Sequence, residues 1–147
     1  MNILGFSFTK IAAQRTEGVQ ETSALDTNIK FTTVEKDSAP LLKQDALVKI
    51  GFSFELTYAT NQAKKREQYA SVICEGVILV SCLEKEAQEV LKFWKKKELP
   101  ANFKVPLFNL IIRKCSIKTL ALQDDLNLPT NVKIPQVDTQ TMTTENS

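Results

Sequence analysis

The stretch "VKIGFSFELTY", residues 48–58, constrains the fold of this chain more than any other segment. Every second residue in it is large and apolar, from Val48 through Phe52 and Phe54 to Tyr58, and the residues between are polar or small. Strict alternation of this kind predicts a β-strand with one apolar face and one solvated face. The sheet that holds this strand therefore needs a cover over its apolar face.

Three further segments predict strands beside this one. They are "ILGFSFTKI" from residue 3, "NIKFTTVEK" from residue 28 and "YASVICEGVILVS" at residues 69–81, which alternate or are rich in β-branched and aromatic residues. The charged segment "NQAKKREQ", residues 61–68, predicts a hairpin loop. Four strands in succession favour an antiparallel meander, and Gly76 inside the last strand indicates a bulge or a close approach by another segment.

The apolar spacing then changes from two residues to that of a helix. Residues 83–98, "LEKEAQEVLKFWKKKE", place acidic residues early and lysines late, which suits the helix dipole, and Pro100 follows. Residues 105–123, "VPLFNLIIRKCSIKTLALQ", predict a longer second helix with Pro106 in its first turn. These elements predict an α+β fold, with a four-stranded antiparallel sheet followed by two helices packed on one face. The pattern leaves open which face that is.

The second predicted helix carries apolar residues on more than one side, so the chain's own sheet does not account for all of them. We expect a second copy of the same helix to cover the rest, giving a homo-oligomer in which a dimer is built into a tetramer. A monomer, with this helix covered by its own sheet, first helix and tail, is the alternative. The predicted interface residues are Leu107, Leu110, Ile111, Ile117 and Ala121.

The chemistry available to the chain is limited by its composition. Its 147 residues contain no histidine, which removes Ser–His and Cys–His pairs, histidine acid–base chemistry and most zinc sites. Four unclustered glycines leave no phosphate-cradling loop. We therefore predict no catalytic residues, no metal site and no cofactor. The three cysteines lie among apolar residues and predict reduced, buried thiols in a cytoplasmic protein.

Charge and hydropathy also argue against nucleic acid and a membrane as partners. A net charge of +2 is weak evidence for nucleic acid. The runs "KKR" (64–66) and "KKK" (95–97) are explained by a loop and a helix end, although RNA binding through them stays an alternative. Glu84, Glu86 and Glu89 are explained as solvated helix residues. No segment is apolar for long enough to enter a membrane, and the first residues do not resemble a signal peptide.

The order of these elements resembles the SecB family of export chaperones and their SecB-like relatives. The likeness spans residues 3–135 and is carried by "ALVKIGFSFELTYAT", "YASVICEGVILV" and "PLFNLIIRKCSIKTLALQDDLNLP". SecB-type chains have a helix opening on a Leu-Phe-Pro-like segment and a run ending near "LNLAPV", and here "VPLFNLIIRKC" and "LNLPTNV" stand in those places. The resemblance implies one SecB-like domain, residues 1–135, and we expect residues 136–147 to be a disordered polar tail.

The resemblance also implies a function, which is ATP-independent holding of unfolded polypeptides in apolar grooves by a dimer of dimers. The SecB proteins of the export pathway are strongly acidic and this chain is not, so an export motor and a dedicated client such as an antitoxin both stay open as partners. An adaptor that binds one folded partner is the alternative function. The predicted client-binding residues are Phe52, Phe54, Tyr58, Phe93, Trp94, Phe103 and Phe108.

Overall fold

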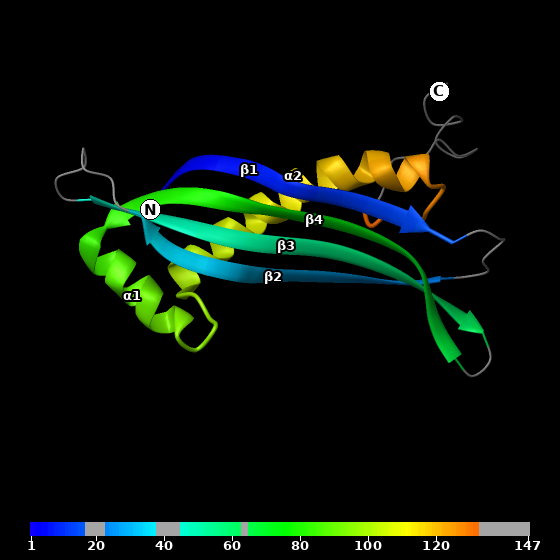
Figure 1. Cartoon of the computed structure of the whole chain (residues 1–147), viewed down its shortest axis with the longest axis horizontal. Coiled ribbons are helices and arrows are strands. Elements are labelled where there is room, and N and C mark those ends of the chain that lie inside the picture. Colours follow the sequence, from blue (N-terminus) through cyan, green and yellow to red (C-terminus); the bar gives the residue numbers. More distant parts are fainter. Residues whose placement is uncertain (17–22, 38–44, 63–64, 133–147) are drawn as a thin grey trace, which may run out of the picture.

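The computed structural model describes residues 1–16, 23–37, 45–62 and 65–132, and it confirms the predicted fold class. A four-stranded antiparallel sheet is followed by two helices, and the longer helix runs diagonally behind the sheet in the view of Figure 1. The predicted tail, residues 136–147, lies outside the described residues. The elements are β1 (Asn2–Arg15), β2 (Ser23–Asp37), β3 (Asp45–Gln62), β4 (Lys65–Leu83), α1 (Glu84–Trp94) and α2 (Ala101–Asp125).

The strand order is β1-β4-β3-β2, so the predicted simple meander is wrong. Strands β2, β3 and β4 are neighbours in chain order, whereas β1 pairs with β4 and lies at the opposite edge from β2. This is the arrangement of a Greek key. Alternation in a strand fixes which face each side chain takes, but it does not fix which neighbour the strand pairs with, and this is why the sequence pattern missed the position of β1.

The core lies against one face of the two central strands. Alternate residues of β3, from Val48 to Tyr58, are buried there, and their partners on β4 include Ile78, Cys74 and Val72. Helix α2 covers this face, and α1 contributes Ala87 and Val90 to the same core. Among the described residues, no helix lies over the opposite face of the sheet (Figure 1).

Gly76 marks a close approach, as its position in the sequence indicated. It pairs with Phe8 of β1 on one side and with Phe52 of β3 on the other. A Cβ atom added at Gly76 would lie 2.7 Å from Cζ of Phe52 and would overlap the carbonyl oxygen of Ser7. The missing side chain lets the Phe52 ring lie flat across β4 and stack on Phe6, with 5.0 Å between the ring centroids.

The helix and hairpin boundaries differ from those that the sequence predicts. Helix α1 begins where the Glu86 carboxylate accepts a 3.2 Å hydrogen bond from the Leu83 N–H, and it ends at Trp94, before the lysine run. The end is a Schellman-type turn in which Lys97, at φ 60°, takes the left-handed conformation. Strands β3 and β4 extend into the predicted loop at residues 61–68, and α2 begins at Ala101, so that Pro106 lies inside the helix.

Candidate functional site

Helix α2 buries a stripe of residues that recurs every four positions. A spacing of four drifts by about 40° per repeat around a helix with 3.6 residues per turn, so the stripe winds around the helix and follows the twist of the sheet. The helix starts against β2, where Phe108 stacks on Phe31, and ends near β1, where Arg15 bonds the carbonyls of Leu126 and Asn127. The buried stripe consists of Phe103, Leu107, Ile111, Cys115, Thr119 and Gln123.

The remaining sides of α2 keep several large apolar residues in contact with solvent. Val105, Ile112 and Ile117 are 58%, 45% and 69% exposed. Of the five residues predicted at an oligomer interface, Leu107 and Ile111 belong to the chain's own core. Leu110 is half-buried, and Ile117 and Ala121 face solvent. The chain therefore covers the inner stripe of α2 itself and leaves apolar surface on the outside.

Four of the seven aromatic residues predicted to bind a client lie in the core. Phe52, Phe54, Tyr58 and Phe103 are at most 1% exposed, so they offer no surface to another chain in this structure. The physical reason is that α2 covers the apolar face of β3, and Phe103 is the first residue of the buried stripe of α2. Alternation identified the apolar face of β3 but could not show that the chain itself covers it.

The other three predicted aromatic residues lie at the surface between α1 and the first half of α2. Phe93 is 40% exposed, while Trp94 and Phe108 are half-buried. Phe108 stacks on Phe31 of β2 with 4.9 Å between centroids, a contact that the sequence analysis missed, although the alternation of "NIKF" was a signal for it. We name this region the helical apolar surface and define it as Phe31, Phe93, Trp94, Val105, Phe108 and Ile112.

Two lysines border this surface. The Lys97 ammonium lies 4.9 Å from the centroid of the Trp94 ring, and the Lys104 ammonium lies 5.7 Å from that of Phe108. Such cation–π contacts are worth about 0.5–1 kcal/mol where the ammonium stays exposed. The surface therefore combines apolar area with positive charge at its border.

The far end of α2 is fixed by polar contacts. Asn127, at φ 53°, closes a Schellman turn in which the Leu128 N–H bonds the Gln123 carbonyl at 2.8 Å. The Tyr58 hydroxyl donates to the Pro129 carbonyl at 2.6 Å and accepts from the Gln123 side-chain amide at 2.6 Å. These contacts dock the "LNLP" segment on the sheet and hold the C-terminal end of α2 in place.

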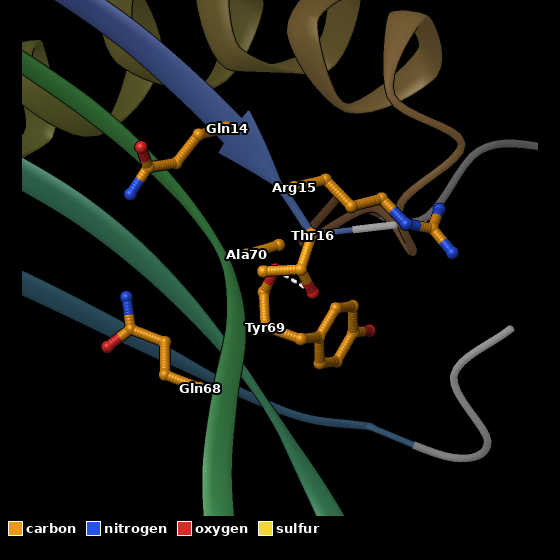
Figure 2. Close-up of a pocket in the computed structure, with 6 residues that line it drawn as sticks. All are labelled: Gln14, Arg15, Thr16, Gln68, Tyr69 and Ala70. Atoms are coloured by element: carbon orange, nitrogen blue, oxygen red, sulfur yellow. Dashed lines mark hydrogen bonds between the residues drawn. The ribbon is translucent and has the colours of Figure 1, made fainter. Parts of the chain in front are cut away.

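A hollow of about 200 Å³ lies beside these contacts, between the end of β1 and the first residues of β4. Figure 2 shows the side chains of Arg15 and Tyr69 next to each other, with the Thr16 hydroxyl bonded to the Tyr69 carbonyl at 3.2 Å. The Arg15 guanidinium lies 5.9 Å from the centroid of the Tyr69 ring. Arg15 also donates hydrogen bonds to the carbonyls of Leu126 and Asn127, so it joins the end of β1 to the C-terminal end of α2.

Two titratable groups of the core, Tyr58 and Cys115, have raised pKa values, which favours their neutral forms. Burial raises the pKa of Tyr58 above 10.0, although the hydrogen bond from Gln123 opposes it. A side-chain hydrogen bond with Cys74, together with burial, raises the pKa of the Cys115 thiol. All three cysteines are free and buried, as predicted. Within the described residues there is no group of three or more potential metal ligands.

The β1 edge also carries exposed apolar residues. Ile3, Leu4 and Ile11 are 41–55% exposed on a strand whose only charged residues are Lys10 and Arg15. The β2 edge carries five charged residues on a strand of similar length. Charged side chains protect a sheet edge from pairing with another strand, so β1 is the less protected edge.

The fold is SecB-like, as a comparison with solved structures shows. The chain is similar to the Mycobacterium tuberculosis SecB-like chaperone Rv1957, solved in complex with a ChAD peptide from the Rv1956 HigA1 antitoxin. The TM-score is 0.52 at 17% sequence identity, and the match covers 93% of this chain and 91% of the other. No family model and no curated protein sequence matches the chain. In the described part of the chain, no helix is long and apolar enough to cross a membrane.

Proposed function

We propose that the chain is an ATP-independent holdase that binds unfolded polypeptides. The observation that carries the proposal is the helical apolar surface, which leaves Phe93, Val105 and Ile112 exposed on a SecB-like fold. An unfolded chain offers apolar side chains in no fixed geometry, and burial against such a surface is non-directional and tolerates many sequences. The similar M. tuberculosis chaperone was solved with a peptide bound, which supports a polypeptide as the ligand here.

The proposal includes self-association in a cytoplasmic protein. A second copy pairing along the β1 edge would satisfy the outward backbone groups of that strand and cover Ile3, Leu4 and Ile11. A contact between two copies of this one edge is two-fold symmetric and closes as a dimer. Two such dimers meeting through the outer sides of α2, at Ile117 and Ala121, would form the expected dimer of dimers.

Suppression of aggregation tests the function. A thermally denatured model protein should stay soluble in the presence of a near-stoichiometric amount of the chain, without ATP. The variant Val105→Thr/Ile112→Thr should lose roughly half or more of this protection, since it removes two exposed apolar side chains of the helical apolar surface, and it should stay folded because both positions are exposed.

The matched control makes the same kind of change on the open face of the sheet. Ile73→Thr/Val77→Thr alters two half-buried positions of β4 that face away from the helices, and it should protect as well as the wild type. Unchanged aggregation in the presence of the wild-type chain would reject the proposal and would favour an adaptor that binds one folded partner.

A further inference from the structure

The positive charge of this chain is concentrated in residues 90–118, the segment that carries most of the helical apolar surface. Residues 90–118 contain eight of the 19 basic residues and one of the 17 acidic residues, Glu98. All eight basic side chains are exposed. The net charge of +2 is therefore the sum of a strongly basic helical region and a net acidic remainder of the chain. The eight residues are Lys92, Lys95, Lys96, Lys97, Lys104, Arg113, Lys114 and Lys118.

Two of these lysines touch the surface itself and are not merely near it. Lys97 lies over the ring of Trp94, and Lys104 lies over the ring of Phe108 at the place where that ring stacks on Phe31. Val105 and Ile112, both exposed, belong to the same half of α2 as Lys104. An apolar side chain that binds there comes within reach of at least one ammonium group.

An acidic ligand can exchange one of these contacts for a better one. A carboxylate of the ligand can pair with the ammonium of Lys97 or Lys104 and move it away from the aromatic ring. An apolar side chain of the ligand can then pack on that ring. The exchange gives up an exposed cation–π contact and gains an ion pair beside newly buried apolar surface. A basic ligand meets repulsion at the same positions and leaves the rings covered by the lysines.

We propose that the helical apolar surface selects acidic client segments, in which Asp or Glu alternates with large apolar residues. This inference rests on the proposed holdase function and names its substrate class. RNA is the less favoured ligand, because single-stranded nucleic acid needs successive open aromatic rings. Here Phe31 and Phe108 stack on each other, Trp94 is half-buried, and most of the exposed apolar residues are aliphatic.

The test uses two unstructured fluorescent peptides with the same Phe and Leu residues, one carrying Glu and the other Lys at every intervening position. Fluorescence anisotropy with the full chain gives both dissociation constants. At about 0.05 M NaCl the acidic peptide should bind at least about tenfold more tightly, and at about 0.5 M NaCl, where screening is strong, the ratio should fall below about threefold.

Two variants locate the preference. Lys97→Gln/Lys104→Gln keeps most of each aliphatic stem and removes the two charges that touch the rings, so the ratio between the peptides should fall several-fold. Lys10→Gln/Lys49→Gln removes two exposed charges from the open face of the sheet and should leave the ratio unchanged. Circular dichroism checks that both variants are folded.

Each outcome decides a separate point. Equal binding of the two peptides, tighter binding of the basic one, or a preference that survives Lys97→Gln/Lys104→Gln overturns the inference and leaves the holdase function standing. Failure of both peptides to bind rejects the holdase function itself. Displacement of the acidic peptide by an RNA oligonucleotide at equal concentration overturns the inference in favour of a nucleic-acid surface.

Discussion

Replacing Gly76 by alanine tests the packing on which the sheet and its helical cover depend. The added methyl group would lie 2.7 Å and 2.9 Å from two atoms of the Phe52 ring, where ordinary contacts begin near 3.4 Å. It would also overlap the backbone carbonyl of Ser7, which β1 holds in register with β4. The Phe52 ring is 1% exposed and stacked on Phe6, so it has little room to move.

The expected cost follows from these overlaps. Overpacking by one methyl group costs about 1–3 kcal/mol, and Gly76→Ala belongs near the upper end because one of the obstacles is backbone. A loss of about 2–3 kcal/mol should lower the melting temperature by roughly 5–10 °C in a chain of this size. The measurement is urea unfolding followed by far-UV circular dichroism at one fixed protein concentration, because association adds to apparent stability.

Gly5→Ala is the matched control. Gly5 also lies in the sheet, on β1, but a Cβ atom there meets nothing within 4 Å, so the free energy of unfolding should stay within about 0.5 kcal/mol. The double variant Gly76→Ala/Phe52→Leu should be less destabilised than the sum of the single variants, because both changes act on one contact. Equal stability of Gly76→Ala and Gly5→Ala would refute this account of the packing.

Two further predictions concern single residues. Lys97→Gly should stabilise the end of α1 by about 1 kcal/mol. Lys97 takes the left-handed conformation, which costs a residue with a Cβ atom about 1 kcal/mol and costs glycine little. Thermal unfolding measures the gain. Tyr58→Phe should cost about 1–3 kcal/mol at neutral pH, because it removes the donor to Pro129 and the acceptor for Gln123. Since burial raises the pKa of Tyr58 above 10.0, its contribution is complete below pH 10.0 and is lost as the pH rises through the folded pKa. Urea midpoints measured through that range should therefore fall more steeply for the wild type than for Tyr58→Phe, and parallel curves would contradict this.

The sequence predicted the elements well because local patterns determine them. The alternation from Val48 to Tyr58 identified the face of β3 that the structure buries, and the change to helical spacing after β4 identified both helices. The place of β1 beside β4 was missed, because it depends on long-range pairing that no local pattern records. The left-handed turn at Lys97 was missed as well, because glycine is the usual residue at such a position and a lysine gives no signal.

The candidate site was predictable only in part. Aromatic residues on an apolar strand face look the same in sequence whether their own chain or another covers them, so Phe52 and Phe54 could not be told from surface residues. The sequence analysis placed Leu107, Leu110, Ile111, Ile117 and Ala121 together and did not identify the spacing of four that the structure buries, because a stripe that winds around a helix matches only a twisted sheet. The Phe31–Phe108 stack joins residues far apart in the chain, which needs the tertiary fold.

The most direct test of the central claim is the mass of the chain in solution, measured by sedimentation equilibrium at low micromolar concentration. One copy leaves Ile117 on the outer side of α2 and Ile3, Leu4 and Ile11 on β1 exposed, and we expect further copies to cover them. This expectation predicts a mass of two or four times the 16.5 kDa of one chain, and a lower mass for a variant in which Leu4 and Ile117 are both replaced by aspartate. A mass of 16.5 kDa at every concentration would contradict it.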